Sequence, residues 1–200
     1  MLQDTPMAHE ITRADIMPME VYANERAAHR ARAVALKKHR RVEVGPFATF
    51  YFENRDTMWH QIHEMLFIER GGEAQVADEL AAYNPLVPQG RELVATIMFE
   101  IDDETRRKTV LARLGGIEET AFLRVAGNVI RGVPEPDVDR TSAAGKASAV
   151  QFVHFPFNDA QVAAFRAPGA EVVVGFEHAN YGHMAVMPET VRAALAEDFD

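Results

Sequence analysis

Three polar side chains on one short segment could bind a divalent metal. His60, His63 and Glu64 have i, i+3 and i+4 spacing, so on a helix they would lie on neighbouring turns of one face. Imidazole and carboxylate groups are common zinc ligands. The order His-x-x-His-Glu matches neither His-Glu-x-x-His nor His-x-x-Glu-His, the motifs of zinc peptidases. An incidental histidine pair on the surface is therefore the alternative to a metal site.

A second group of histidines lies in the C-terminal half of the chain. His178 and His183 flank a predicted loop that also contains Tyr181, and His154 lies on a predicted strand. If the strands pair, the three imidazoles could meet as metal ligands or as an acid/base set. The alternative is three separate surface histidines, with Tyr181 packing on the edge of a sheet.

Glu69 stands out on a helical wheel of residues 56–70. The apolar face of this wheel consists of Met58, Trp59, Ile62, Met65 and Leu66. Glu69 falls in the middle of that face, and a buried carboxylate costs free energy unless it is paired or hydrogen-bonded. We therefore predict an ion pair between Glu69 and Arg55 or Arg70. As an alternative, Glu69 or Glu64 could act with a histidine as a metal ligand or a catalytic base.

Length and composition indicate a soluble globular protein. The chain has 200 residues, of which 48% are hydrophobic and 26% charged, as in ordinary single domains. The absence of cysteine excludes thiolate zinc sites, protein-ligated iron–sulfur clusters and disulfides. No apolar run reaches the ~20 residues of a membrane span. The N-terminus lacks the apolar stretch of a secretory signal, so we expect a cytoplasmic protein.

A basic segment contrasts with the acidic balance of the whole chain. The net charge of -9 argues against general affinity for nucleic acids. Cations nevertheless crowd one early segment: Arg26, Arg30, Lys37, Lys38, Arg40 and Arg41. We expect them to dock an anion or an acidic partner. A contact with RNA or DNA is a weaker alternative. The remaining alternative is that these cations form a solvated helix face with no binding role.

Helices are predicted from stretches without breakers and from capping residues. Residues 1–14 show no periodicity and are predicted to form a flexible arm, followed by a single α+β domain over 15–200. The stretch 19–39 is rich in Ala, Glu, Arg, Leu and Lys and predicts one long basic helix. Asp56 is the predicted N-cap of the next helix, which ends at Gly71-Gly72. Further helices are predicted over 73–82, 104–114, 159–166 and 188–197.

Strands are predicted between these helices. Residues 41–44 and 47–52 flank Gly45-Pro46, which predicts a hairpin. The segment 93–101 is apolar on both faces, which is typical of a central strand. Further strands are predicted over 121–125, 128–133, 147–157 and 171–177. There is no regular βαβ rhythm, so we predict an α+β fold with a mainly antiparallel sheet covered on one face by helices. The polar segment 134–146 is a candidate for a mobile lid.

Several phrases of the sequence together identify a family resemblance. They include Ile16-Met17-Pro18, Leu36-Lys37-Lys38, Gly45-Pro46, Phe52-Glu53-Asn54-Arg55-Asp56-Thr57, Ile68-Glu69-Arg70 and Tyr83-Asn84-Pro85-Leu86. With these the chain resembles, from Ile16 to the last helix, a bacterial family catalogued only as a domain of unknown function. Its genes often lie beside those of a rubrerythrin-like diiron protein and a heterodisulfide-reductase-type iron–sulfur oxidoreductase. The resemblance implies an accessory or binding protein of redox or peroxide defence, with one of these as partner.

The resemblance also ranks the candidate sites. The family pattern matches at Glu53, Asn54, Arg55, Asp56, Gln61, Glu64, Glu69 and Arg70. It does not include His60 or His63, which favours a polar network over a histidine metal site. It carries no established activity or cofactor, so whether the chain is an enzyme stays open.

Overall fold

The computed structural model describes residues 9–136, 142 and 145–200. The helices are α1 (Met19–Lys38), α2 (Arg55–Glu69), α3 (Glu73–Tyr83), α4 (Glu104–Leu111), α5 (Asp159–Arg166) and α6 (Glu189–Ala196), with short 3-10 turns η1 (Arg13–Asp15), η2 (Asn84–Leu86) and η3 (Ile117–Thr120). The strands are β1 (Arg41–Val44), β2 (Ala48–Glu53), β3 (Glu92–Phe99), β4 (Ala121–Val125), β5 (Asn128–Arg131), β6 (Val133–Pro134), β7 (Val150–Pro156), β8 (Val172–Phe176) and β9 (Met184–Val186). The predicted α+β class is confirmed.

The strands form two antiparallel sheets that pack face to face. One sheet has the order β1-β2-β3-β7-β6 and the other β5-β4-β8-β9. Aromatic and branched side chains of both sheets share one hydrophobic core; the rings of Phe50 on β2 and Phe176 on β8, for example, lie 5.0 Å apart between centroids. The sequence predicted one mainly antiparallel sheet, whereas the structure has two antiparallel sheets. The two short sheets form a sandwich because each buries its apolar face against the other.

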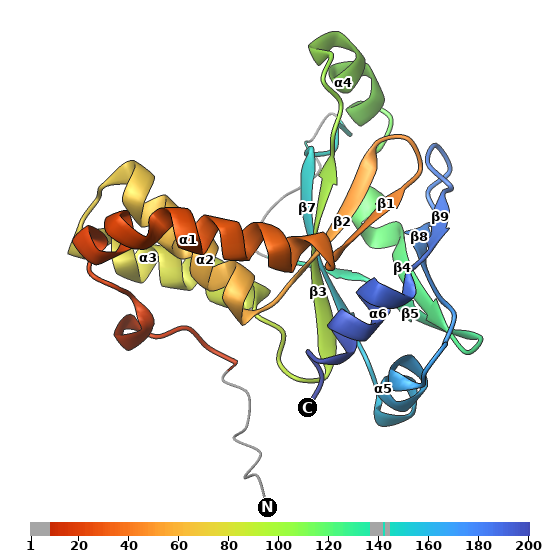
Figure 1. Ribbon diagram of the computed structural model, residues 1–200. Coiled ribbons are helices and arrows are strands. Elements are labelled where there is room, and N and C mark those ends of the chain that lie inside the picture. Colours follow the sequence, from red (N-terminus) through yellow and green to blue (C-terminus); the bar gives the residue numbers. More distant parts are fainter. Residues whose placement is uncertain (1–8, 137–141, 143–144) are drawn as a thin grey trace, which may run out of the picture.

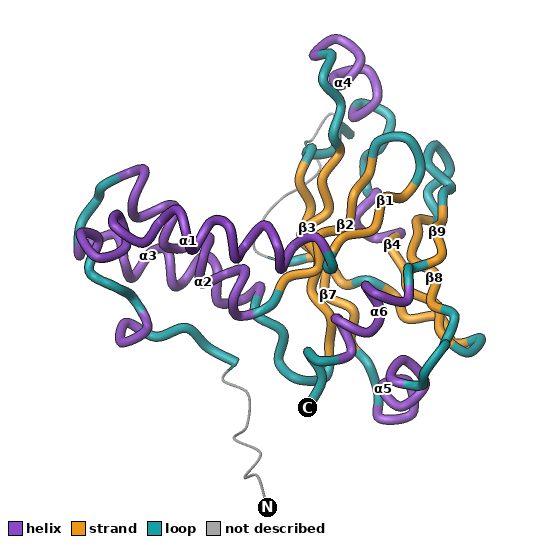
Figure 2. Tube along the Cα trace, viewed as in Figure 1, coloured by secondary structure: helices purple, strands orange, loops and turns teal. Residues whose placement is uncertain are grey.

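Three helices form an arm on the outer face of the five-stranded sheet. In Figure 1, α1, α2 and α3 lie side by side and extend away from the strands, and Figure 2 separates this helical part from the sheets by colour. A second hydrophobic cluster joins Met58, Ile62 and Leu66 of α2 to Val94 of β3. Alternate residues of β3 thus face two different cores, which confirms its predicted central position.

Local signals place the ends of the arm helices. Asn54, and not the predicted Asp56, is the N-cap of α2: its side-chain oxygen accepts from the backbone N–H of Thr57 at 2.9 Å. The Thr57 hydroxyl reciprocally accepts from the Asn54 N–H at 2.9 Å. The helix ends where Arg70 adopts a left-handed conformation with φ 56°. The first helix ends within one residue of its prediction.

The N-terminal segment packs on the arm from His9 onwards. The side chain of Ile11 is fully buried in the arm cluster, and its backbone exchanges two hydrogen bonds with the Asn84 side chain, at 2.8 and 2.9 Å. The part of the predicted arm before His9 lies outside the described residues. The same holds for most of the predicted lid over 134–146, of which residues 137–141 and 143–144 are not described.

Candidate binding site at the Glu53–Asp56 turn

The turn that joins β2 to α2 lies between two cavities. Glu53, the last residue of β2, lines one of them, and Asn54, Arg55 and Asp56 line the other. Each has a volume of about 290 Å³, close to the lower end of the range for small-molecule sites. The segment that the family pattern singles out is therefore positioned by a strand end and a helix start to face both cavities.

The first cavity, which we call the arm cavity, lies between the helical arm and the outer face of the five-stranded sheet. Its walls come from α1, α2, α3, η2 and the central strands of that sheet. Most of the lining is apolar or aromatic, including Tyr51, Tyr83 and Phe152. Among the described residues, Lys37 of α1 and Glu53 are the only Lys, Arg, Asp or Glu side chains in its lining. Such a mainly apolar site with few polar groups is typical of ligand pockets.

The Glu53 carboxylate is held at this cavity by two threonines. The residue is only 5% exposed. The hydroxyl of Thr57 donates to one carboxylate oxygen at 2.6 Å, and the hydroxyl of Thr96 donates to the other at 2.7 Å. One donor comes from α2 and the other from β3, so the carboxylate also joins the arm to the sheet.

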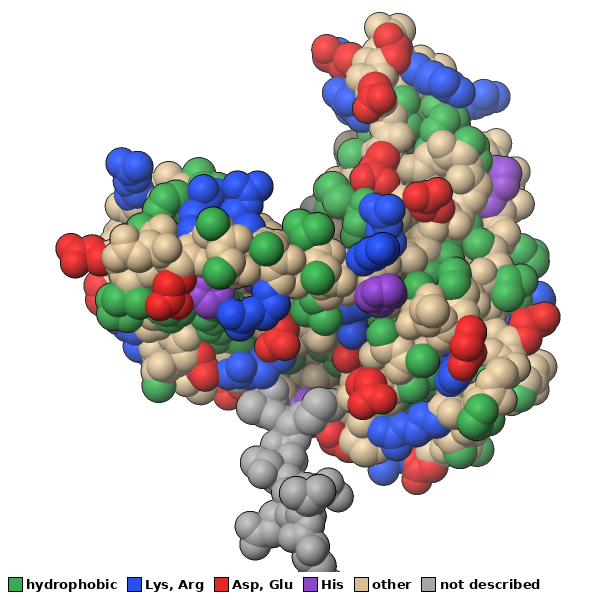
Figure 3. All heavy atoms as spheres, in the orientation of Figure 1, with side chains coloured by type: hydrophobic (Ala, Val, Ile, Leu, Met, Phe, Trp, Pro, Cys, Tyr) green, Lys and Arg blue, Asp and Glu red, His purple; other side chains and the backbone are tan. Residues whose placement is uncertain are grey.

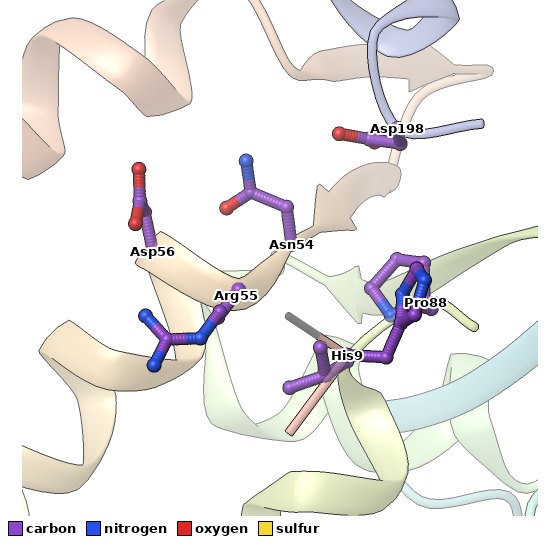
Figure 4. A pocket seen from close by; sticks show the side chains of 7 residues that line it. His9, Asn54, Arg55, Asp56, Pro88 and Asp198 are labelled. Atoms are coloured by element: carbon purple, nitrogen blue, oxygen red, sulfur yellow. Dashed lines mark hydrogen bonds between the residues drawn. The ribbon is translucent and has the colours of Figure 1, made fainter. Parts of the chain in front are cut away.

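Figure 4 shows the second cavity, which is lined by residues from four distant parts of the chain. His9 and Pro88 come from segments near the arm, Asn54 to Asp56 come from the turn, and Asp198 follows α6. The Arg55 guanidinium is already engaged: it forms an ion pair with Asp15 at 2.7 Å and donates to the backbone oxygen of Glu10 at 3.2 Å. In the view it points away from His9 and Pro88.

At the wall of this cavity, a buried ion pair between Arg40 and Asp198 fixes the turn. Arg40 and Asp198 are 3% and 7% exposed and form a short charged hydrogen bond. The Arg40 guanidinium also donates to the backbone oxygens of Phe52 at 2.9 Å and Glu53 at 3.1 Å. Burial raises the pKa of Asp198 above its ordinary value, although Arg40 opposes this. Arg40, predicted as a docking residue, therefore has a structural role inside the fold.

Glu64 faces α1 and is fully paired. Arg26 donates to both of its carboxylate oxygens, at 2.9 and 2.8 Å, and the Tyr22 hydroxyl donates at 2.7 Å. These hydrogen bonds, that of Arg26 first, lower the pKa of Glu64 to about 2 despite its partial burial. Arg26 is thus a second predicted docking residue that the fold uses internally. The role of Tyr22 was missed, although its position one turn before Arg26 is a signal in the sequence.

The histidines of α2 serve the packing of the arm. His63 is fully buried; its Nε2 accepts from the Met17 N–H at 3.1 Å, so its Nδ1 carries the proton and donates to the Trp59 oxygen at 2.7 Å. Burial lowers the pKa of His63. His60 lies 3.3 Å from the Tyr22 hydroxyl. His60 and Glu64 therefore share the Tyr22 hydroxyl as a partner, whereas His63 is held by backbone groups of Met17 and Trp59.

The prediction for Glu69 is wrong. Its side chain is exposed and accepts from the Gln75 amide at 2.7 Å, with no ion pair among the described residues. Arg55 lies fourteen residues earlier on α2, about 21 Å away along the axis, so it cannot reach. Arg70 ends the helix in a left-handed conformation, and the chain turns away there. Gln61 lines the arm cavity and donates to the Tyr83 hydroxyl at 3.5 Å.

The C-terminal histidines are not brought together. His154 on β7 lies between two carboxylates, with Glu92 2.9 Å from Nδ1 and Glu135 2.8 Å from Nε2. His178 and His183 lie beside β8 and β9 of the other sheet, where His178 contacts the Gly115 oxygen at 3.2 Å. Across the described ranges, no group of three or more His, Asp or Glu side chains is arranged to hold a metal ion.

Part of the predicted basic segment remains at the surface. Arg30, Lys38 and Arg41 are exposed, and in the described part of the chain none of them forms an ion pair. We call these three residues the basic face. Figure 3 shows Lys and Arg side chains along the arm and in the angle between the arm and the strands. No described helix combines the length and apolarity that a membrane crossing requires.

Comparisons with known proteins identify relatives but no activity. A family model described as "Protein of unknown function (DUF3501)" matches residues 10–199. A crystal structure of a novel protein of unknown function from Burkholderia pseudomallei is 40% identical, covers 95% of this chain and 99% of its own, and superimposes with a TM-score of 0.88. No curated protein matches the chain.

Proposed function

The chain belongs to the DUF3501 family of proteins of unknown function, and we propose that it is a cytoplasmic accessory protein that docks an acidic partner protein through its basic face. The observation that carries this proposal is a set of three exposed cations, Arg30, Lys38 and Arg41, which lie within residues 30–41 of a protein of net charge -9 and have no ion-pair partner among the described residues. Such a local field attracts an acidic surface and orients it.

The arm gives the basic face a rigid support. The bidentate contact of Arg26 with Glu64 and the stacking of its guanidinium 4.6 Å above the Phe67 ring tie α1 to α2. The buried Arg40 ties the end of α1 to β2. Because the helix is tied to its surroundings at Arg26 and just after its C-terminal end, the exposed cations would lose little conformational freedom of the backbone on docking.

The redox setting of the proposal is supported by the family resemblance. The partner would be a rubrerythrin-like diiron protein or an iron–sulfur oxidoreductase. This chain contains no cysteine to ligate an iron–sulfur cluster, so the partner would carry such a centre. The accessory protein would contribute binding energy and orientation.

Co-purification with each candidate partner from the same organism tests the proposal. We expect a complex at low salt that dissociates as salt rises, since exposed charges are screened over about 8 Å at physiological ionic strength. The triple variant Arg30→Glu, Lys38→Glu and Arg41→Glu should abolish it. A matched triple variant with Lys108→Glu, Arg113→Glu and Lys146→Glu, which are exposed elsewhere, should retain it. The absence of a complex even after crosslinking would overturn the proposal.

Two alternatives have separate tests. The first alternative is a metal-binding protein or enzyme that uses Glu64 or Glu69 with a histidine. If it is right, protein purified without a histidine tag should contain stoichiometric metal. Sub-stoichiometric metal would refute this alternative. A nucleic-acid contact through the basic face predicts salt-dependent retention on heparin, and passage at low salt would dismiss it.

A further inference from the structure

The Glu53 carboxylate is buried without a cation at the arm cavity. Its two oxygens accept one hydroxyl each, from Thr57 and Thr96, whereas an ionised carboxylate has about four acceptor positions. Within the described residues no Lys, Arg or His forms an ion pair with it. A buried charge is costly unless it is paired, so a cation at the cavity side of this carboxylate would complete the site.

A second, opposite charge lines the same cavity. Lys37 of α1 is half-buried there, and in the described part of the chain its ammonium group forms no ion pair with Glu53 or another carboxylate. An amine without an acidic group would be attracted by Glu53 and repelled by Lys37. A carboxylic acid without an amine would be attracted by Lys37 and repelled by Glu53. A molecule with both charges satisfies both side chains.

The rest of the lining specifies the body of such a molecule. Met58, Leu86, Met98 and Val150 are apolar, and Tyr51, Tyr83 and Phe152 contribute aromatic rings. Gln61 and Thr96 are the remaining polar side chains of the lining. The volume of about 290 Å³ suits a small molecule that buries an apolar group. The second cavity offers no such combination, because its arginine is already paired with Asp15.

We propose that the arm cavity binds a small zwitterion with an apolar or aromatic body, the chemical class of the hydrophobic amino acids, with its ammonium group on Glu53 and its carboxylate on Lys37. The ammonium group would fill the unused acceptor positions of Glu53. The apolar body would lie against the aromatic walls. This site is separate from the basic face, and ligand binding does not require a partner protein.

Titration calorimetry with four probes, L-phenylalanine, L-leucine, phenethylamine and 3-phenylpropionate, tests the chemical class. L-phenylalanine should bind, whereas phenethylamine, which lacks the carboxylate, and 3-phenylpropionate, which lacks the amine, should each bind at least about tenfold more weakly, since one charged contact is lost. The proposal is overturned if phenylalanine and L-leucine give no binding. It is also overturned if the acid or the amine binds as tightly as the zwitterion.

Matched variants locate the site. Glu53→Gln and Lys37→Met should each weaken phenylalanine binding about tenfold or more. Glu43→Gln on the exposed side of β1 and Lys108→Met on the exposed side of α4 should leave it unchanged. If Glu53→Gln loses its native circular dichroism spectrum, Lys37→Met decides the matter. Unaltered affinity in Lys37→Met would overturn the proposal.

Discussion

Removal of the buried Asp198 carboxylate should strongly destabilise the fold. In Asp198→Ala, the Arg40 guanidinium would remain buried, at 3% exposure, without its only carboxylate partner among the described residues. Breaking one side of a buried ion pair costs about 3–5 kcal/mol. Arg40 keeps two backbone oxygens as acceptors, so we expect the lower end, about 3 kcal/mol. For a chain of this length that corresponds to a fall in Tm of roughly 6–12 °C.

The assay is urea unfolding followed by circular dichroism and by the fluorescence of Trp59, the single tryptophan. The exposed neighbour Glu197 supplies the control, because Glu197→Ala should change the free energy of unfolding by no more than about 0.5 kcal/mol. Asp198→Asn, which keeps an acceptor, should lie between the two variants.

A double variant separates the cost of leaving Arg40 without a carboxylate from the net contribution of the ion pair to stability. Burial raises the pKa of Asp198 in spite of Arg40, which indicates that desolvation outweighs the attraction. Replacement of both residues by apolar ones, Arg40→Met with Asp198→Leu, should therefore recover part of the lost stability, because no buried charge remains while the Phe52 and Glu53 oxygens lose their Arg40 donor. A cost below about 1 kcal/mol for Asp198→Ala, or a double variant as unstable as the single one, would refute this reasoning.

Three further predictions follow from other contacts. The fold lowers the pKa of Glu64 to about 2, so the ionised carboxylate stabilises the folded state, by about 1–3 kcal/mol, at every pH above the ordinary pKa of a glutamate. This stabilisation is lost as the pH falls towards 2. The difference in free energy of unfolding between wild type and Glu64→Gln should therefore be smaller at pH 3 than at pH 7. Tyr181→Phe should cost about 2 kcal/mol, since the buried hydroxyl accepts from two backbone N–H groups and donates to one carbonyl at the β1–β2 turn; a thermal melt unchanged from wild type would contradict this. Burial lowers the pKa of His154, but its two carboxylate partners raise this pKa more, so the net shift is upward. The protonated imidazole therefore stabilises the fold at a pH below the ordinary histidine pKa, and this stabilisation is lost as the pH rises through the pKa of the folded state. A pKa at or below 6.5 in a proton NMR titration would contradict the upward shift.

Local signals predicted much of the secondary structure. The long helix over 19–39, the hairpin around Gly45-Pro46 and the central strand over 93–101 depend on propensity, turn chemistry and alternation within a few residues. The short strands β6 and β9 were missed, because edge strands of two or three residues have no pattern of their own. Their pairing is decided by neighbours far away in the sequence.

Long-range partners decided the candidate site. The sequence by itself determined the α+β class and the presence of exposed basic residues on the first helix, and its family resemblance pointed to the Glu53–Asp56 turn. Only the tertiary structure showed that Glu64 forms an ion pair with Arg26, that Arg40 forms one with Asp198, and that Glu69 is exposed. A charged side chain chooses its partner by distance and burial in three dimensions, and Arg40 and Asp198 are 158 residues apart in the chain. The cavity that Glu53 faces likewise exists only where the arm meets the sheet.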